Sequence, residues 1–274
     1  MGHVRNLDLS DLFLNIYHFY TKALLKNLKD TRNDETIVMF SDAYDVRIFK
    51  DVQTILKTFR EFDANIVFGA EYFYAPKPEI LKMYPLIANG GTYNTNQKYQ
   101  FQDFFRNVYS FTLDLTFLNS GFFIGYLKDI YPIVSMIIDK YKIKPTQDDQ
   151  EFFHYIYLDE DLREKHNIKL DHNSKLVFNL YGIAEDARFQ CVDGSLKLFD
   201  AYHQTYPLIL HANGVAKKML PWLNKLEEKC ERSEIKNLAE FFKIPEEIFH
   251  RSRNFVFRKF LYTRPWENKM KIEF

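Results

Sequence analysis

Short apolar runs and longer amphipathic stretches alternate along most of the chain. Runs rich in β-branched and apolar residues predict strands at 36–40, 65–70, 118–126 and 207–210. Apolar positions at helical spacing predict helices at 8–30, 51–62, 130–141 and 150–158. A strand, a helix and a second strand in succession usually form a parallel crossover. The pattern therefore predicts an α/β sandwich with a mainly parallel central sheet and helices on both faces.

Two segments need a separate interpretation. The strand at 36–40 is short and apolar, which is typical of a strand buried on both faces. The segment 86–116 is rich in Asn, Gln, Tyr and Phe and has weak periodicity. We expect it to form a long excursion over the surface, and long loops of this kind are often functional lids.

The chain shows no internal repeat and no Gly/Ser-rich or Pro-rich linker, so no clean division into two domains is visible. After Pro221 the pattern becomes helical and basic, with Arg and Lys interleaved with Phe and Tyr. We expect an α/β domain at 1–226 and a basic, aromatic, helical C-terminal tail at 227–274. Such a tail either docks partly on the domain or contacts a membrane surface or an acidic partner.

Composition narrows the function classes. Lys and Arg (37) balance Asp and Glu (37), so no nucleic-acid partner is expected. Cys191 and Cys230 are too few for a four-thiolate zinc site, although they could form one disulfide. A metal would therefore need carboxylate and imidazole ligands. No signal-peptide pattern opens the chain and no transmembrane segment is expected, so the sequence itself predicts a soluble protein.

Two carboxylates follow directly on the strand at 36–40. Asp42 and Asp45 are three residues apart, and ligands in open α/β sheets bind beyond the carboxyl ends of the strands. A divalent cation held by this pair would keep positions open for a diphosphate, as a sugar-nucleotide enzyme requires. Either Asp could instead cap the helix that follows the strand.

Other polar residues end or follow predicted elements. His211 and Asn213 follow the strand at 207–210, where a lone His is more often a satisfied polar residue than a metal ligand. Asp148 and Asp149 open a predicted helix, where they could complement the helix dipole or face a substrate hydroxyl. Glu71 ends one strand and Asn119 begins another, and neither is decisive singly.

Ten segments that carry these residues match one known family in the same order. They are IVMFSDAYDV at 37–46, VFGAE at 67–71, MYP at 83–85, FLNSG at 117–121, IGY at 124–126, DDQ at 148–150, YLD at 157–159, LDH at 170–172, NL at 179–180 and HANG at 211–214. The chain resembles, over about 36–223, the glycosyltransferase domain of the procollagen-lysine hydroxylase (lysyl hydroxylase, PLOD-like) family. The resemblance implies a GT-A-like nucleotide-diphospho-sugar transferase fold. It also implies UDP-galactose or UDP-glucose as donor, manganese (Mn2+) as cofactor, and hydroxylysine or galactosyl-hydroxylysine of a collagen-like protein as acceptor.

Residue roles follow from the resemblance, position by position. The metal ligands would be Asp42, Asp45 and His211. Tyr44 would line the uridine site. The sugar and acceptor pocket would be lined by Glu71, Asn119, Asn213, Asp148 and Asp149. The two last residues are the best candidates for orienting or deprotonating an acceptor hydroxyl, for which the ionised form is required.

The chain also departs from the family pattern. Only about 35 residues precede the strand at 36–40, so the opening strand and Gly-rich turn that help to hold the nucleotide are expected to be missing. Phe122 stands where the family usually has a second glycine after Gly121, and a phenylalanine there would fill volume beside the ligand. These departures support the alternative of a non-catalytic binding module. A metal-dependent phosphoester hydrolase is a third reading.

The length and the family give two more expectations. The chain is too short to include the oxygenase part of the hydroxylases, so lysine hydroxylation is not expected. Family resemblance suggests the lumen of the endoplasmic reticulum, although the visible N-terminus carries no signal for it.

Overall fold

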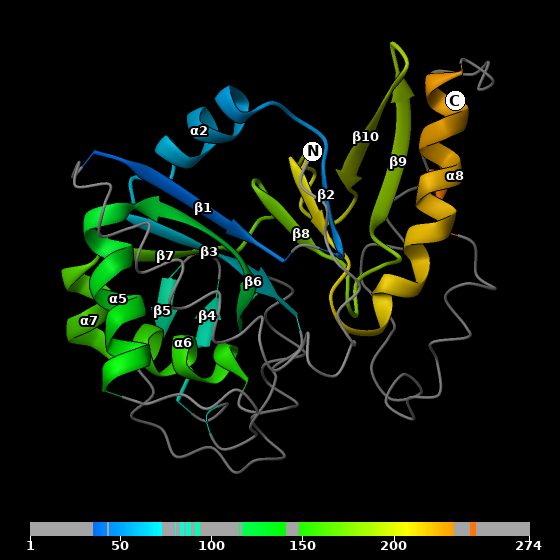
Figure 1. Ribbon diagram of the computed structural model, residues 1–274. Coiled ribbons are helices and arrows are strands. Elements are labelled where there is room, and N and C mark those ends of the chain that lie inside the picture. The colour runs from blue at the N-terminus through cyan, green and yellow to red at the C-terminus, as the bar shows by residue number, and fades with distance from the viewer. Residues whose placement is uncertain are drawn as a thin grey trace, which may run out of the picture.

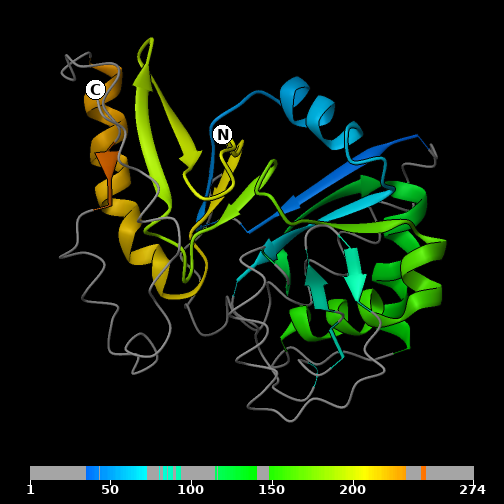
Figure 2. The same ribbon diagram turned by 180° about the vertical axis from the view of Figure 1, so that it is seen from behind.

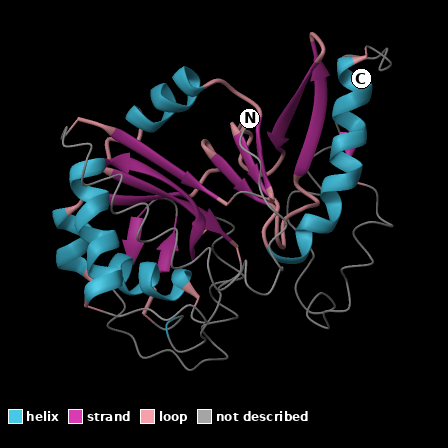
Figure 3. Ribbon diagram, viewed as in Figure 1, coloured by secondary structure: helices cyan, strands magenta, loops and turns pink. Residues whose placement is uncertain are grey.

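The computed structural model describes residues 35–42, 44–72, 80, 83–84, 86–88, 91–93, 115, 117–140, 148–232 and 242–244 (Figure 1). The predicted helix at 8–30, the opening of the chain and most of the predicted tail lie outside these residues. The described part of the chain combines strands and helices throughout, as expected for an α/β protein (Figure 3).

The central sheet has four strands in the order β1-β6-β3-β7. They are β1 (Ile37–Ser41), β6 (Phe117–Tyr126), β3 (Ile66–Glu71) and β7 (Ile168–Asp171). Strand β6 is antiparallel to both β1 and β3, whereas β7 is parallel to β3. The prediction of a mainly parallel sheet is therefore wrong for the pairing. Strands β1, β3 and β7 nevertheless run in the same direction, and the antiparallel strand β6 lies between β1 and β3.

Helices cover both faces of this sheet, as predicted. Helix α2 (Val52–Arg60) lies on one face, and α5 (Leu127–Asp139), α6 (Asp149–Leu158) and α7 (Glu160–Lys165) lie on the other (Figures 1 and 2). The apolar stripe of α2 buries Ile55 and Phe59 against Val67 and Ile124 of the sheet. Because each face carries its own apolar cluster, the sheet is the middle layer of a sandwich.

Strand β1 is less buried than its sequence predicts. Its five residues are partly buried or exposed, and Met39 is 37% exposed. Among the described strands, β1 pairs with β6 alone and so forms one edge of the sheet. The prediction of burial on both faces is wrong because an apolar run does not distinguish a central strand from an edge strand.

The described part of the fold also contains two smaller three-stranded sheets. In the first, β11 (Ile209–His211) lies between β2 (Val46–Ile48) and β8 (Val177–Asn179). In the second, β9 (Ala187–Val192) lies between β10 (Ser195–Asp200) and β12 (Phe242–Lys243). Within the predicted excursion, β4 (Leu86–Ala88) and β5 (Gly91–Tyr93) form an antiparallel pair.

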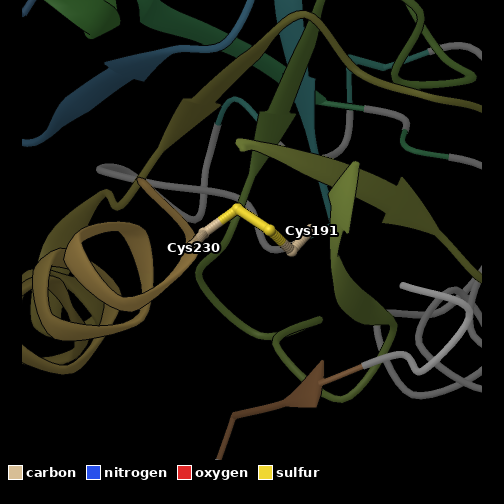
Figure 4. Close-up of a disulfide and its surroundings, with 2 residues drawn as sticks. All are labelled: Cys191 and Cys230. Atoms are coloured by element: carbon tan, nitrogen blue, oxygen red, sulfur yellow. A yellow bond between two sulfur atoms is a disulfide. The ribbon is translucent and has the colours of Figure 1, made fainter. Parts of the chain in front are cut away.

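The last long helix, α8 (Leu220–Glu231), follows a 3-10 turn, η1 (Gly214–Met219), and runs beside β9 and β10 (Figure 1). A disulfide between Cys191 of β9 and Cys230 of α8 joins the helix to the sheet, with a Cα–Cα distance of 5.6 Å (Figure 4). From the sequence alone, this disulfide was possible but not decided. The described helices include none that is long and apolar enough to cross a membrane.

Helix α8 runs across the expected boundary between 226 and 227, and β12 pairs with β9. The division into 1–226 and 227–274 stays a prediction, because the remainder of the tail lies outside the described residues.

Candidate active site

Two strand ends bring three potential metal ligands together. Asp42 directly follows β1, and His211 ends β11. The connection after β1 is fixed to β11, since Val46 pairs with His211 and the Ala212 N–H donates to the Asp45 carbonyl oxygen at 2.7 Å. As a result, one ligand atom from each of Asp42, Asp45 and His211 lies within 4.8 Å of the others.

The donor set suits a divalent cation. His211 Nε2 lies 3.3 Å from Asp42 Oδ2 and 3.8 Å from Asp45 Oδ1. This nitrogen is buried and makes no hydrogen bond to any residue that the structure describes. A cation between this nitrogen and the two carboxylates would satisfy all three groups. The residues therefore fit the metal that the resemblance implies.

The capping interpretation of the two aspartates is wrong. The helix after β1 and β2 begins with Asp51 as its N-cap, whose side chain accepts from the Thr54 N–H at 2.9 Å. Asp42 and Asp45 thus have no capping role in α2, and their side chains face His211 instead.

A bulge in β6 makes room for the ligands. Gly69 pairs with Asn119 while Phe68 pairs with Phe123, so 120–122 are displaced from the ladder with β3. The displaced strand remains hydrogen-bonded: the Gly121 N–H donates to Asn119 Oδ1 at 3.0 Å, and the Gly121 carbonyl oxygen accepts from the Asp42 N–H at 2.9 Å. The bulge therefore joins the backbone of Gly121 directly to the ligand segment.

Phe122 does not occupy the site. Its side chain is fully buried in the apolar cluster that contains Ile55, Phe59 and Val67, on the face covered by α2. The expectation that a phenylalanine at this position fills volume beside the ligand is wrong, because the side chains of successive β6 residues point to opposite faces.

A buried hydrogen-bond network lies next to the metal ligands. Gln150 Nε2 donates to Glu71 Oε1 at 2.8 Å, and Asn213 Nδ2 donates to Glu71 Oε2 at 2.9 Å. The Asn119 side chain also hydrogen-bonds Glu71. Burial raises the pKa of Glu71 to about 8 against the opposing effect of these hydrogen bonds. Each oxygen of Glu71 accepts from an amide, so this residue holds the amides of Gln150 and Asn213 in place.

Asn213 links the network to a neighbouring loop. Its Oδ1 accepts from the Tyr181 N–H at 2.9 Å while its Nδ2 contacts Glu71. Gln150, which the sequence interpretation left without a role, likewise accepts from the Ser120 N–H at 3.2 Å in the β6 bulge. Its place after two acids at a helix start was the available signal.

Asp148 and Asp149 lie at the start of α6, next to Gln150 of the buried network. Asp148 caps α6 by accepting from the Gln150 N–H at 3.0 Å, so part of its role is structural, while Asp149 is partly buried in the first turn. Burial, followed by the negative charges of Asp148 and Asp42, raises the pKa of Asp149 to about 7. The pKa of Asp148 is also raised. The first cause is the protein atoms packed around its carboxyl group, although the residue is exposed, and the second is the negative charge of Glu151 and Asp42.

Two further side chains flank the ligands. Tyr44, between the two aspartates in sequence, is 79% exposed and presents a free aromatic face. Lys217 Nζ lies 3.5 Å from Asp45 Oδ2. The sequence interpretation missed this lysine, and the signal was its position three residues after Gly214, where the η1 turn leaves β11.

The fold and the site together define a class of protein: an α/β sandwich that carries two carboxylates and an imidazole at its strand ends. A family model described as the PLOD GT domain matches 19–100 and 100–235. The chain belongs to this family, and the resemblance inferred from the ten sequence segments is confirmed.

Three relatives illustrate the match. A Caenorhabditis elegans "multifunctional procollagen lysine hydroxylase and glycosyltransferase" is 34% identical over 192 residues, covering 69% of this chain and 22% of the relative. The human "multifunctional procollagen lysine hydroxylase and glycosyltransferase LH3" is 30% identical over 190 residues, with shares of 69% and 22%. A Drosophila melanogaster "procollagen-lysine,2-oxoglutarate 5-dioxygenase" is 34% identical over 188 residues, with shares of 67% and 22%. The chain thus spans about a fifth of the length of these relatives.

Proposed function

We propose that this protein is a metal-dependent glycosyltransferase that moves galactose or glucose from a UDP-sugar to hydroxylysine or galactosyl-hydroxylysine of a collagen-like protein. The observation that carries the proposal is the convergence of Asp42, Asp45 and His211 at two strand ends. Family membership supports the transferase class, and the names of the relatives support the collagen acceptor. The alternative of a non-catalytic module loses its support at Phe122, which packs away from the site.

The proposed cofactor is Mn2+, held by Asp42, Asp45 and His211. When bound, it would offset the charge of the donor diphosphate and stabilise the departing nucleotide. The Lys217 ammonium, 3.5 Å from Asp45, is placed to meet a phosphate oxygen beside the ligands. The exposed ring of Tyr44 offers an apolar face on which uracil can stack.

Asp148 and Asp149 are proposed to act on the acceptor hydroxyl. Asp149, with its pKa raised to about 7, is able to accept a proton from the acceptor hydroxyl near neutral pH. Asp148 is fixed by its capping bond and is proposed to orient the same hydroxyl. The amides of Asn119 and Asn213 are held by Glu71 and are proposed to line the sugar pocket.

We also propose that the protein works in the lumen of the endoplasmic reticulum. The Cys191–Cys230 disulfide supports this location, because structural disulfides persist in oxidising compartments. The collagen-modifying relatives are consistent with it.

The test combines binding with transfer. A ligand that binds only the native state at 100 times its dissociation constant stabilises by about 2.7 kcal/mol, so UDP with Mn2+ is expected to raise Tm measurably. Labelled hexose is expected to pass from UDP-galactose or UDP-glucose to a hydroxylysine-containing collagen peptide. Asp42→Asn is expected to lose both signals, while Asp51→Asn, which preserves a capping side chain outside the site, keeps them. Absence of both signals in the wild-type protein, with Asp42→Asn behaving identically, contradicts the proposal.

A further inference from the structure

Asn179 is in direct contact with the candidate ligand His211. Strands β8 and β11 are parallel neighbours, with Asn179 opposite His211 in the register. Asn179 Oδ1 and His211 Nδ1 are 2.8 Å apart, and Asn179 is completely buried. This contact lies on the side of the imidazole opposite the nitrogen that faces Asp42 and Asp45.

The orientation of the Asn179 amide is fixed by a second contact. Asn179 Nδ2 donates to the Ala70 carbonyl oxygen at 2.8 Å. A backbone carbonyl only accepts hydrogen bonds, so the NH2 group must point to Ala70 and the amide oxygen must point to His211. Gly69 leaves space for this arrangement, because a Cβ there would lie 2.9 Å from Asn179 Nδ2.

The amide orientation determines the state of the imidazole. An amide oxygen has no proton to donate, so the hydrogen bond requires a proton on His211 Nδ1. In the neutral ring the other nitrogen, Nε2, then carries the lone pair. This nitrogen is the one without a hydrogen-bond partner among the described residues.

We propose that Asn179 is a positioning residue, which holds His211 as the Nδ1–H tautomer and so directs the Nε2 lone pair toward Asp42 and Asp45. The inference rests on the proposed metal-dependent function for its purpose, although the tautomer itself is a property of the metal-free protein. A chain of contacts carries it from the Ala70 carbonyl through the Asn179 amide to His211. Partners of metal-bound histidines that fix the tautomer typically change metal affinity 10–100-fold when removed.

Two substitutions separate the two contacts of Asn179. Asn179→Leu is similar in volume and removes the acceptor and the donor together. Asn179→Asp retains an acceptor for His211 Nδ1 and loses only the donor to Ala70. In Mn2+ titrations followed by calorimetry and by electron paramagnetic resonance, without any substrate, we expect Asn179→Leu to bind about 10–100-fold more weakly than wild type. Asn179→Asp is expected to bind within a few-fold of wild type or more tightly.

Asn173→Leu serves as the control. Asn173 lies just before β8 and is exposed, so the same exchange there is expected to leave Mn2+ binding unchanged. The rescue by Asn179→Asp distinguishes positioning from general support, because both Asn179 variants lose the contact with Ala70. Equal affinities of Asn179→Leu and wild type overturn the inference, as does equal weakening in Asn179→Leu and Asn179→Asp.

A spectroscopic measurement decides the tautomer without any substitution. In metal-free protein labelled with 15N-histidine, long-range 1H–15N spectra are expected to show His211 protonated on Nδ1, with assignment from the missing signal in His211→Gln. A ring that carries its proton on Nε2 alone, with none on Nδ1, overturns the inference. If Asn179→Leu fails to fold, this measurement on the wild-type protein still tests the inference. A wild-type protein that shows the Nδ1–H tautomer but does not bind Mn2+ leaves the inference standing and contradicts the proposed function.

Discussion

Gly121 lies against the imidazole of His211 so closely that a Cβ at position 121 would stand 2.2 Å from the His211 Cε1 atom. The same Cβ would lie 2.9 Å from Asp42 Oδ2. A side chain of any size at this position must therefore displace one of the two candidate ligands.

Gly121→Ala is expected to weaken Mn2+ binding by an order of magnitude or more, measured by calorimetry, while the purified protein stays folded by circular dichroism. The physical reason is displacement of His211, whose ring is buried and cannot move without disturbing its contact with Asn179. Gly194→Asn is the control: nothing lies within 4 Å of a Cβ there, and Asn tolerates its φ of +72°. Unchanged affinity in Gly121→Ala would show that Mn2+ binding does not depend on the positions of His211 and Asp42 beside Gly121.

Phe122→Gly is expected to destabilise the protein by about 3–5 kcal/mol or more, because it removes a fully buried ring from the cluster beneath α2. It introduces the glycine that the family resemblance leads us to expect, and it is nevertheless expected to leave affinity for UDP with Mn2+ unimproved. Urea unfolding measures the first effect and ligand titration the second. A gain in affinity would mean that Phe122 restricts the site after all.

Transfer activity is expected to rise with pH through a midpoint at or below about 7 and then to level off. Asp149 must be ionised to accept a proton, and burial with the charges of Asp148 and Asp42 raises its pKa to about 7. A bound cation would offset the charge of Asp42 and so lower the midpoint. The pH profile of kcat checks this, with Asp149→Asn expected to lose most of the activity and the rising limb. Asp161→Asn on α7 is a surface control. A residual Asp149→Asn activity with the same rising limb would assign that limb to another group.

The stability of the metal-free protein is expected to fall as pH rises from about 4.5 to about 8. In the folded state burial raises the pKa of Glu71 from 4.5 to about 8, so the native protein retains a proton that the unfolded chain releases. In that window Glu71 contributes a slope of at most about 1.4 kcal/mol of unfolding free energy per pH unit, with stability decreasing upward.

Glu71→Gln is expected to remove this contribution. Urea unfolding at several pH values compares the slopes of wild type and Glu71→Gln, since the baseline stability of the variant also drops when one amide loses its acceptor. Glu61→Gln, on the surface after α2, is expected to keep the wild-type slope. Identical slopes in wild type and Glu71→Gln would place the retained proton elsewhere.

The set of candidate metal ligands came from the family resemblance, and the position of strand ends supports it. Asp42 and His211 each follow an apolar strand, and strand ends in α/β proteins gather at one edge. The spacing of apolar residues located α2, β3, β6, α5, α6 and β11 to within a few residues. The same patterns did not reveal β7 to β10. Strands β7 and β8 are short, and β9 and β10 alternate buried with less buried residues and so lack a continuous apolar run.

Residues that act through other residues were beyond the sequence interpretation. The Asn179 contact with His211 depends on the parallel register of β8 and β11, and the Gly121 contact depends on the β6 bulge. Which strands become neighbours depends on tertiary pairing, and the local sequence pattern does not show it. The antiparallel entry of β6 was missed for the same reason, since the direction of a strand depends on tertiary pairing.

The bridge between Cys191 and Cys230 encloses His211, Asn213 and Lys217 within a covalently closed segment. Recombinant protein made in a host whose cytosol keeps thiols reduced will therefore lack the constraint on the part of the chain that carries these three side chains. Secretion or an oxidising host is the appropriate production route, and titration of free thiols in each preparation should precede any assay of activity.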